Sequence, residues 1–466
     1  MAFDATYYSI PALMFALVLF GLLSLFHRNK RVAFAATSIL LAGIFAASLS
    51  NMAYGSNALL FGAYSISPFS SYLLVLFSSI FLIINWFAYS SASDYFKLNF
   101  IMSVLAIGIF TVPMANSLIT IIIAIELMSA PTILLIAFGG KRYAEPATKM
   151  FLLSAISVSV LAFAIALAFP YDVTLSLHAA STANPFNSGY LLMLSLGLFV
   201  VAFGTEAALF PFNFWIPDVY QGAPSHITAM IAGLNKKVAF IAMIEVLFTL
   251  FAAYTGTISV ILSVVAILTM FFGNLGAMTQ TSVKRMFAYS SISQAGYISV
   301  GIAAANSFGI EASLFQIFAH SFMIVGAFII IGLLEAYGLA TVKDYSGLSR
   351  RNGLAAAGLT IIMLSLAGIP PLIGFVGKFL LFSSAISSGL IALAIIGILN
   401  SFISIYYYGR LISSMYGASD QRSIALTKSA YFVIGAILAV IIAFGVYPEP
   451  LIIAAKAAAT SLAGFA

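Results

Sequence analysis

The sequence predicts an all-α polytopic membrane protein with about 14 transmembrane helices. Of its 466 residues, 63% are hydrophobic and only 7% are charged, whereas soluble domains carry about 25% charged residues. Apolar stretches of about 20 residues, each long enough to cross ~30 Å of hydrocarbon as a helix, recur from end to end. A membrane β-barrel would instead show alternating segments of about 10 residues. These observations exclude a water-soluble globule and a barrel.

The predicted transmembrane segments are numbered here as helices 1 to 14, and several are long enough to require a tilt or a break. They comprise residues 8–26, 32–50, 68–91, 97–113, 116–138, 147–169, 189–216, 224–252, 256–279, 283–304, 309–338, 353–386, 388–410 and 426–447.

Lys and Arg test this number of helices, because short cytoplasmic loops are enriched in them. Of the 19 Lys and Arg residues, fifteen follow odd-numbered helices, and only Lys456, in the tail, lies on the other side. The fifteen are Arg28, Lys30, Arg31, Lys97, Lys141, Arg142, Lys149, Lys284, Arg285, Lys343, Arg350, Arg351, Arg410, Arg422 and Lys428. We therefore expect a multi-pass protein of a cell membrane, prokaryotic rather than mitochondrial, with both termini on the outer face.

Composition also limits the chemistry of the chain. There is no cysteine, which excludes iron–sulfur ligation, disulfides and thiol catalysis. Among the four histidines, only His320 lies well inside an apolar segment, so a haem held by two membrane histidines is not expected. The net charge of +6 resides in the short loops and reflects topology, so no nucleic-acid partner is expected.

Six charged side chains fall well inside the predicted helices, away from their first residues, and a seventh, Glu335, lies near the end of helix 11. The six are Glu126, Glu206, Lys236, Lys237, Glu245 and Lys378. Each central charge costs ~2.5–3.5 kcal/mol on insertion scales, so we expect these side chains to face the interior of the bundle, to form pairs or to contact water. A purely structural pair or a snorkelling side chain is the alternative, especially for Lys237, Glu245 and Glu335.

Prolines interrupt two of the helices. Pro211 and Pro217 in LFPFNFWIPD break helix 7, and Pro370 and Pro371 in AGIPPLIGFVGK break helix 12. Such breaks survive in a membrane only where protein or water satisfies the freed backbone. Helices 7 and 12 lie five apart, and an odd number of helices inverts a repeat. The sequence therefore predicts two inverted five-helix repeats with a broken helix in each, which is typical of transporters.

The predicted organisation has four parts. Residues 1–96 form helices 1–3, residues 97–252 form the first repeat (helices 4–8), residues 256–410 form the second repeat (helices 9–13), and residues 411–466 form helix 14 and the tail. A simple proline kink is the alternative for either break taken alone.

Three motifs resemble the antiporter-like membrane subunits of respiratory complex I. They are PFNFWIPDVYQGAP (211–224), VKRMFAYSSISQAGY (283–297) and LAGIPPLIGFVGKF (366–379). DVYQGAP and the IELMSAP stretch around Glu126 are most similar to subunit N, also called NADH-quinone oxidoreductase subunit N or NADH dehydrogenase subunit 2. The resemblance covers about residues 60 to 450, and the lack of a long amphipathic C-terminal extension argues against subunit L.

The resemblance implies a set of site residues. The helix-5 glutamate of the family matches Glu126, a lysine at the start of helix 6 matches Lys149, the helix-8 lysine matches Lys236, and the helix-12 lysine matches Lys378. On helix 7 the family usually has a lysine, but this chain has Glu206.

The exchange on helix 7 changes the expected electrostatics. Glu206 and Glu126 would face each other as two carboxylates, and close like charges make a pair share one proton. His320 is a further candidate that could bridge helices 8 and 12, since imidazole titrates near neutrality. A packed, neutral histidine is an equally good interpretation of His320.

The resemblance also implies the activity: a non-redox subunit of an NADH (or related donor)-quinone oxidoreductase, a translocase that couples quinone reduction to proton pumping through a mid-membrane chain of Glu and Lys sites. No cofactor is expected in this chain, because flavin, iron–sulfur clusters and quinone would bind in partner subunits. The expected partners are membrane-arm subunits similar to M, K and J, and the lipid bilayer. The alternatives are a Na⁺/H⁺ antiporter subunit, an antiporter-like subunit of a membrane-bound hydrogenase, and an assembly scaffold with an inactive channel.

Overall fold

The structure is a computed structural model that describes residues 5–52, 57–59, 62–92, 94–138, 143–169, 175–177, 189–418 and 423–462. Helices make up most of these residues, and each predicted transmembrane segment contains helix, which confirms the all-α prediction. A short antiparallel hairpin of β1 (Asn57–Leu59) and β2 (Tyr64–Ile66), with Asn57 opposite Ile66, was not predicted. Lys141, Arg142 and Arg422, used above to count helices, lie outside the described residues.

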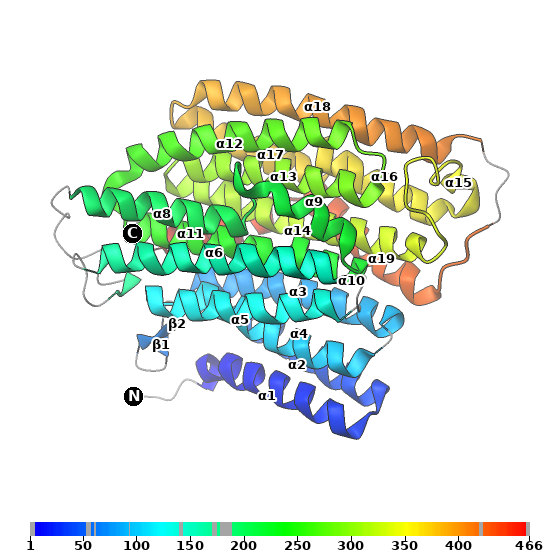
Figure 1. Cartoon of the computed structure of the whole chain (residues 1–466), viewed down its shortest axis with the longest axis horizontal. Coiled ribbons are helices and arrows are strands. Elements are labelled where there is room, and N and C mark those ends of the chain that lie inside the picture. Colours follow the sequence, from blue (N-terminus) through cyan, green and yellow to red (C-terminus); the bar gives the residue numbers. More distant parts are fainter. Residues whose placement is uncertain are drawn as a thin grey trace. The chain divides into compact units, whose positions relative to one another are not determined.

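The chain divides into two compact units. The first unit comprises Met1–Ala207, Leu234–Thr255 and Ala454–Ala466, and the second comprises Ala208–Gly233 and Gly256–Ile453. Figure 1 follows the chain through both units from blue to red. The four predicted parts and the two inverted repeats are a different division, which stays a prediction.

The first unit is built from long helices that pack side by side. They are α1 (Ala5–His27), α2 (Lys30–Asn51), α3 (Pro68–Ser91), α4 (Tyr95–Thr111), α5 (Leu118–Ala137), α6 (Ala144–Ala168), α8 (Tyr190–Glu206) and α11 (Lys236–Thr249), with the 3₁₀ turns η2 (Val112–Met114) and η6 (Ala252–Tyr254). Serine caps start two of them: Ser67 accepts from the amide of Ser70 at α3, and Ser117 accepts from that of Thr120 at α5. α6 packs against α8, and α4 packs against α5.

The second unit surrounds a central helix. Its helices are α9 (Trp215–Gly222), α10 (Ser225–Met230), α12 (Thr255–Met278), α13 (Val283–Ala303), α14 (Ser307–Glu335), α15 (Leu348–Arg351), α16 (Gly353–Ala367), α17 (Ile373–Ser387), α18 (Ile391–Tyr416) and α19 (Lys428–Val446). α14 packs against α10, α13, α16, α17 and α19, and nearly all of its residues are buried. An apolar helix that is buried on every side is the expected centre of such a bundle. A last helix, α20 (Glu449–Thr460), follows α19 and was not predicted.

Both predicted helix breaks are present. α8 ends at Glu206, Ala208 adopts a left-handed φ of 57°, and the chain passes Pro211 and the 3₁₀ turn η4 (Phe212–Phe214) before α9 begins. α16 ends at Ala367, its C-cap residue Gly368 has a φ of 91°, and the amide of Ile369 donates to the Leu364 carbonyl in a Schellman motif. Helix 8 has a break that the sequence did not reveal, because a π-turn, η5 (Ile231–Asn235), separates α10 from α11.

Two glycines allow close backbone contacts around the break in helix 12. A Cβ atom on Gly374 would overlap the carbonyl oxygen of Ser365, and a Cβ on Gly445 of α19 would overlap that of Pro371. Backbone segments therefore lie directly against each other at this break, with no side chain between them.

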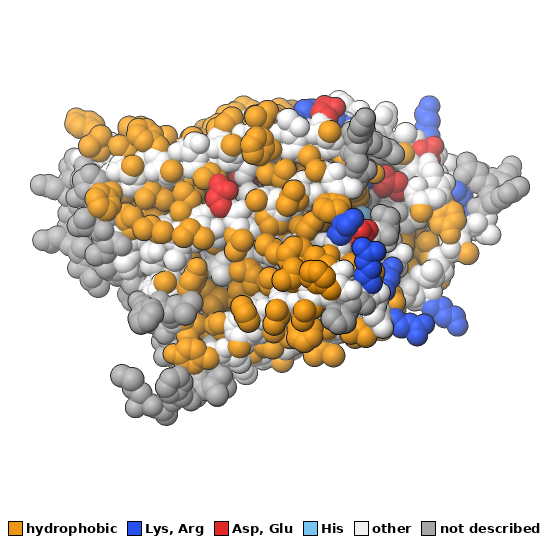
Figure 2. Space-filling view, turned by 60° about the horizontal axis from the view of Figure 1, so that its bottom comes forward, with side chains coloured by type: hydrophobic (Ala, Val, Ile, Leu, Met, Phe, Trp, Pro, Cys, Tyr) orange, Lys and Arg blue, Asp and Glu red, His pale blue; other side chains and the backbone are white. Residues whose placement is uncertain are grey.

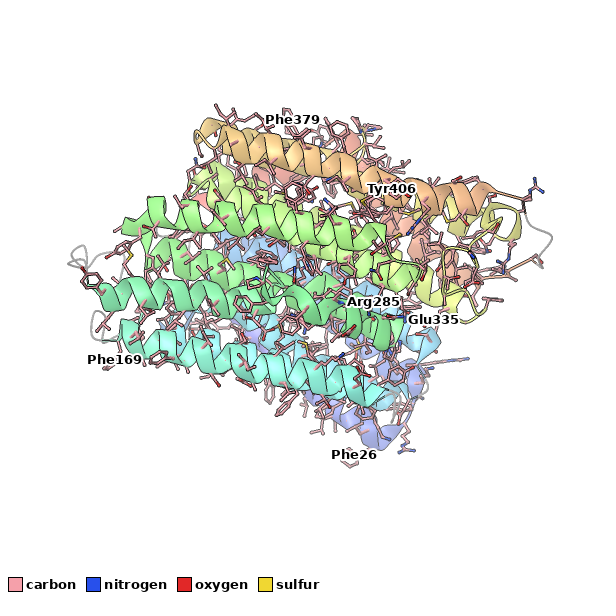
Figure 3. The ribbon with its side chains drawn as sticks, turned by 45° about the horizontal axis from the view of Figure 1, so that its top comes forward. Phe26, Phe169, Arg285, Glu335, Phe379 and Tyr406 are labelled. Atoms are coloured by element: carbon pink, nitrogen blue, oxygen red, sulfur yellow. The ribbon has the colours of Figure 1, made fainter. Side chains whose placement is uncertain are left out.

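The surface of the described residues is largely apolar (Figure 2). Phe379 on α17 and Tyr406 on α18 are 59% and 58% exposed and point away from the ribbon (Figure 3). Such exposure is normal for side chains that face lipid. Eleven helical segments among the described residues are long and apolar enough to cross a membrane.

Three predicted segments are not among these eleven. Two are helices 7 and 12, which their breaks divide into shorter pieces, and the third is helix 10, where α13 begins with Lys284 and Arg285 and contains several serines. The chain is a multi-pass membrane protein, and the number of 14 crossings stays a prediction.

Asp344 secures the loop between α14 and α15. Its Oδ2 atom accepts hydrogen bonds from the amides of Thr341 (2.7 Å) and Ala340 (3.1 Å) and from the Thr341 hydroxyl (2.8 Å). These donors, the Thr341 amide first, hold the pKa of Asp344 below its ordinary value. A carboxylate with a lowered folded-state pKa stabilises the fold above its unfolded pKa, and this contribution disappears as the pH falls through the folded-state pKa.

We expect Asp344→Ala to lower the stability of the purified complex by on the order of 1 kcal/mol at neutral pH, the usual contribution of such hydrogen bonds. Thermal unfolding of this chain, followed from neutral pH downward, measures the effect. The gap between wild type and variant should begin to narrow below pH ~4, the ordinary pKa of an aspartate, and should disappear as the pH falls through the lower folded-state pKa. A gap that persists unchanged to pH ~3 would contradict this account.

Candidate functional site

Glu206 is the last residue of α8 and lies directly before the break in helix 7. Its side chain is 7% exposed, and Ser154 on α6 donates a hydrogen bond to its Oε1 atom at 3.2 Å. One turn further along α6, Ser157 donates to the carbonyl of Ala202 at 2.9 Å. The two serines lie three residues apart, so they share the face of α6 that packs on α8. Glu206 is therefore a buried carboxyl group with a hydroxyl donor, not a side chain facing lipid.

Glu126 lies on the exposed side of α5 and not inside the bundle, contrary to one of the arrangements expected from the sequence. The buried face of α5 is occupied by Ile125 and Met128 instead. Glu126 is still close enough to Glu206 for the two carboxylates to interact through their charges. The structure thus brings these two predicted residues together, with Glu206 inside the unit and Glu126 at its surface.

Lys149 has the most exposed position among the candidate lysines. It lies in the first part of α6, and its Nζ atom forms an ion pair of 2.8 Å with Glu145 one turn earlier. The side chain of Lys149 is 39% exposed and that of Glu145 is 77% exposed. A pair of this kind on a helix surface contributes about 0.3–0.5 kcal/mol.

Lys236 and Lys237 open α11, immediately after the π-turn. Both are fully buried, at 1% and 0% exposure, and they are close enough for their charges to interact. The preceding residue, Asn235, donates from Nδ2 to the hydroxyl of Thr132 on α5 at 2.5 Å. A π-turn changes the direction of the side chains that follow it and is frequent at functional sites. It sets the orientation of both lysines here, and nothing in the residue pattern signalled it.

Lys378 lies on α17, one turn after the break in helix 12. Its side chain is 4% exposed, and Nζ donates to the carbonyl of Ala367 at 2.9 Å. The same ammonium lies 4.5 Å from the centre of the Tyr297 ring. Ala367 is the last residue of α16, so the lysine contacts the negative end of that helix dipole. The break thus creates the anionic end on which Lys378 rests.

His320 is fully buried in the middle of α14. The next residue, Ser321, donates to the carbonyl of Gly233 in the π-turn at 2.9 Å. Since α14 packs against both α10 and α17, the helix that carries His320 contacts the first part of helix 8 and the second part of helix 12. A bridging role of His320 itself stays a prediction.

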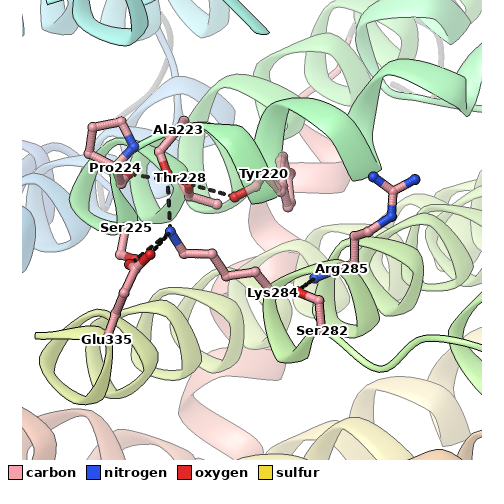
Figure 4. A network of polar contacts seen from close by, with 9 residues as sticks. All are labelled: Tyr220, Ala223, Pro224, Ser225, Thr228, Ser282, Lys284, Arg285 and Glu335. Atoms are coloured by element: carbon pink, nitrogen blue, oxygen red, sulfur yellow. Dashed lines mark hydrogen bonds and ion pairs between the residues drawn. The ribbon is translucent and has the colours of Figure 1, made fainter. Parts of the chain in front are cut away.

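A second polar network, near the end of helix 7, was missed from the sequence (Figure 4). Glu335 accepts from Lys284 at 2.8 Å and from the Ser225 hydroxyl at 2.6 Å, and Lys284 also donates to the Ala223 carbonyl at 3.1 Å. Arg285 forms an ion pair of 2.7 Å with Asp218 on α9. Lys284 and Arg285, interpreted above as topology signals, therefore also fasten the broken end of helix 7 to α13 and α14.

The described residues offer few side chains that could bind a metal ion together. Among the described residues, no group of three or more His, Asp or Glu side chains could hold a metal ion. The buried polar groups described above are carboxylates, lysines and hydroxyls, which are the usual members of proton relays in membrane proteins.

Fold and site together define a polytopic helical membrane protein with ionisable side chains buried beside broken helices, which is the architecture of a membrane translocator. A family model described as "NADH:quinone oxidoreductase/Mrp antiporter, TM" matches residues 115–404. The chain belongs to this family, which confirms the resemblance found in its motifs.

The relatives agree with this assignment. The F420H2 dehydrogenase subunit N of Methanosarcina mazei is 34% identical over 427 residues, covering 86% of this chain and 85% of that protein. The NADH-quinone oxidoreductase subunit N of Desulfitobacterium hafniense is 32% identical over 495 aligned residues, covering 99% of each chain. The similarity to subunit N that DVYQGAP predicted is thereby confirmed.

Solved structures share the fold. A chain of respiratory complex I from Thermus thermophilus with bound aureothin superposes with a TM-score of 0.83 at 26% identity, covering 95% of this chain and 98% of that one. A chain of the Mrp complex from Dietzia sp. has a TM-score of 0.88 at 20% identity, covering 97% of each chain. At that identity, the second likeness concerns the fold alone.

Proposed function

We propose that this chain is the subunit N counterpart in a complex I-type oxidoreductase, where it couples quinone reduction in partner subunits to proton translocation through its buried Glu and Lys side chains. The observation that carries the proposal is the position of Lys378. Burying a lysine in a membrane helix is costly, and such residues mark proton or ion pathways by default. Glu206 beside the break of helix 7 has the corresponding position in the first unit.

The contacts of these groups suit a proton relay. Burial favours the neutral form of a lysine, whereas a carbonyl at a helix end and an aromatic face favour the charged form. A small change in the surrounding charge then releases or captures the proton. The pair of Glu206 and Glu126 can also hold and release a proton in response to a change in charge, since two close carboxylates compete for one proton.

The redox chemistry is assigned to partner subunits. This chain has no cysteine for an iron–sulfur cluster, and we infer that flavin, clusters and quinone bind elsewhere in the complex. The exposed carboxylate of Glu126 in the middle of α5 supports a partner subunit against this surface, since a charge facing lipid would be costly. Subunits similar to M, K and J are the proposed neighbours.

The proposed location is a prokaryotic cell membrane, with both termini outside. At one end of the first unit, Lys30 lies 4.8 Å from the centre of the Tyr89 ring, and Lys97 pairs with Asp94 at 3.0 Å. These residues belong to the loops after helices 1 and 3, so basic side chains from two odd-numbered loops gather at one end. This arrangement supports a cytoplasmic position for that end.

The proposal predicts that the transported ion is the proton. The purified complex, reconstituted in sealed vesicles and driven by its electron donor and quinone, should build a pH gradient of undiminished size in sodium-free buffer. A protonophore should abolish the gradient. Uptake of radioactive sodium that continues with the protonophore present, or a gradient that requires sodium, would instead identify the Na⁺/H⁺ antiporter function that the family also contains.

A further inference from the structure

A small polar cavity lies in the first unit at the C-terminal end of α11. It offers about 40 Å³ of room for water, and its polar lining residues are Ser65, Ser67, Asn116, Glu245, Thr249 and Ser461. A water molecule needs about 10–15 Å³ of such space and two to four polar partners, so the cavity holds about three. Glu245 is its only carboxylate among the described lining residues.

The cavity has unsatisfied hydrogen-bond acceptors. Glu245 is 4% exposed, and its Oε2 atom has no hydrogen-bond partner among the described residues. The same holds for the Oδ1 atom of Asn116, whose amide nitrogen already donates to the Gly62 carbonyl at 2.8 Å. A buried acceptor without a donor costs ~1–3 kcal/mol, so both oxygens require one.

The neighbouring hydroxyl groups do not supply that donor. Thr249 donates to the backbone carbonyl of Glu245, and Ser461 donates to the carbonyl of Ala458 at 2.9 Å. Ser461 additionally accepts from the amide of Phe69 at 3.1 Å. Both hydroxyl protons are therefore committed, and these oxygens face the cavity as further acceptors. Water, or a proton on Glu245, satisfies this arrangement.

The cavity lies at the end of the unit that lacks basic loops. Its lining comes from β2, from the starts of α3 and α5, from the end of α11 and from the residues after α20. By the distribution of Lys and Arg, all of these segments follow even-numbered helices or end the chain, which places them on the outer face.

We propose that Glu245 and this cavity form a hydrated proton-exchange site that opens to the outer face of the membrane. The carboxyl group takes up and releases a proton through the cavity water, and it is separate from the Glu206 and Lys378 positions. The inference that Glu245 exchanges a proton with cavity water is drawn from the geometry of the cavity alone. The further inference that this exchange takes part in transport rests on the proposed function.

Other ionisable side chains stand on the elements around the cavity but do not line it. They are Lys236 and Lys237 on α11, Glu126 on α5, Tyr64 on β2, Tyr72 and Tyr89 on α3, Tyr190 and Glu206 on α8, Tyr254 on η6, and Glu449 and Lys456 on α20. Asp172 and His178, which lie in the same loop sequence as the lining residue Leu177, are outside the described residues. Glu245 is accordingly the group whose charge a probe in the cavity should sense first.

The chain's lack of cysteine permits a direct test in the assembled complex. Ser65→Cys and Ser461→Cys are made separately, and membrane-impermeant cationic and anionic methanethiosulfonates are applied from the outer side. Modification of this chain is followed by mass. Because both reagents react with the same thiolate, the ratio of their two rates does not depend on how far the thiol itself is ionised. Ser50→Cys on α2, whose side chain is exposed, is the matched control.

We expect both cavity cysteines to react, with a preference for the cationic reagent that rises roughly tenfold as Glu245 ionises with increasing pH. Glu245→Gln should remove the rise, and Ser50→Cys should not show it. The exchange site would be refuted if the cavity cysteines stay unmodified. It would also be refuted if the ratio of the cationic to the anionic rate does not change with pH or is not altered by Glu245→Gln. These measurements need no turnover, so they stand even where the proposed function fails. If the site titrates but Glu245→Gln leaves pumping intact, its role in transport is refuted.

Discussion

Lys378→Ala is expected to reduce proton pumping by about tenfold or more while the complex still assembles, since removal of a positioned proton-transfer group typically costs 10²–10⁴ in rate. The reason is the placement of its ammonium group, 2.9 Å from the Ala367 carbonyl and 4.5 Å from the centre of the Tyr297 ring. Alanine removes both the proton carrier and the charge at the end of α16. Lys378→Arg keeps the charge and should retain part of the activity.

Proton uptake driven by the electron donor in reconstituted vesicles measures this result. Lys456→Ala, which removes an exposed lysine from α20, is the matched control and should pump normally. Assembly is checked by the amount of this chain in the purified complex. A fully assembled Lys378→Ala complex that pumps at the normal rate would remove Lys378 from the pathway, and the same result with Glu206→Gln would favour the scaffold interpretation.

Glu206→Gln should lower proton pumping by about tenfold, because glutamine preserves the shape of the side chain but cannot carry a proton between sites. Ser154 can still donate to the Oε1 atom of glutamine, so the packing of α6 on α8 is retained. Glu206→Lys introduces the residue that the family usually has here and places a positive charge near Glu126. We expect it to be tolerated better than Glu206→Ala, which leaves the Ser154 hydroxyl without an acceptor.

Infrared difference spectroscopy offers a readout that a merely structural role would not alter. A carboxyl C=O band that changes during turnover should be lost or shifted in Glu206→Gln and kept in Glu449→Gln, an exposed carboxylate. Normal pumping by Glu206→Gln would show that Glu206 only supports the backbone at the break, and that the proton route passes it by.

Most of the helical outline could be predicted, because long apolar segments and the distribution of Lys and Arg are properties of the sequence itself. Prolines likewise marked the breaks in helices 7 and 12. The π-turn at Ile231–Asn235 could not be predicted. Gly233 and Asn235 are weak helix formers, but they do not specify an extra residue in the turn, and the contacts of the turn with α5 and α14 are visible only in the structure. Short elements such as β1 and α20 lack a periodic signal of useful length.

The site was predictable in its residues but not in its contacts. Glu206 and Lys378 stand out as isolated charges in apolar helices. Their burial could be predicted because exposing a charge to lipid costs free energy. Their partners are a serine 52 positions away and a backbone carbonyl, and neither leaves a mark in the sequence. The exposure of Glu126 could not be foreseen either, because the motif fixes its position along α5 but not which neighbour α5 packs against.

The glycine contacts around helix 12 determine which part of the second unit can move. At Gly374 and Gly445 the backbone of one segment presses on the carbonyl of another, so α16 and α17 cannot swing about their junction as a hinge would. Lys378 consequently stands beside a closely packed backbone junction, and we expect its long side chain to move more easily than the two helix ends. If the proposed function holds, we expect a working cycle of this unit to move the ammonium group of Lys378 over a short distance, in contrast to the large rocking of helices that alternating-access carriers perform.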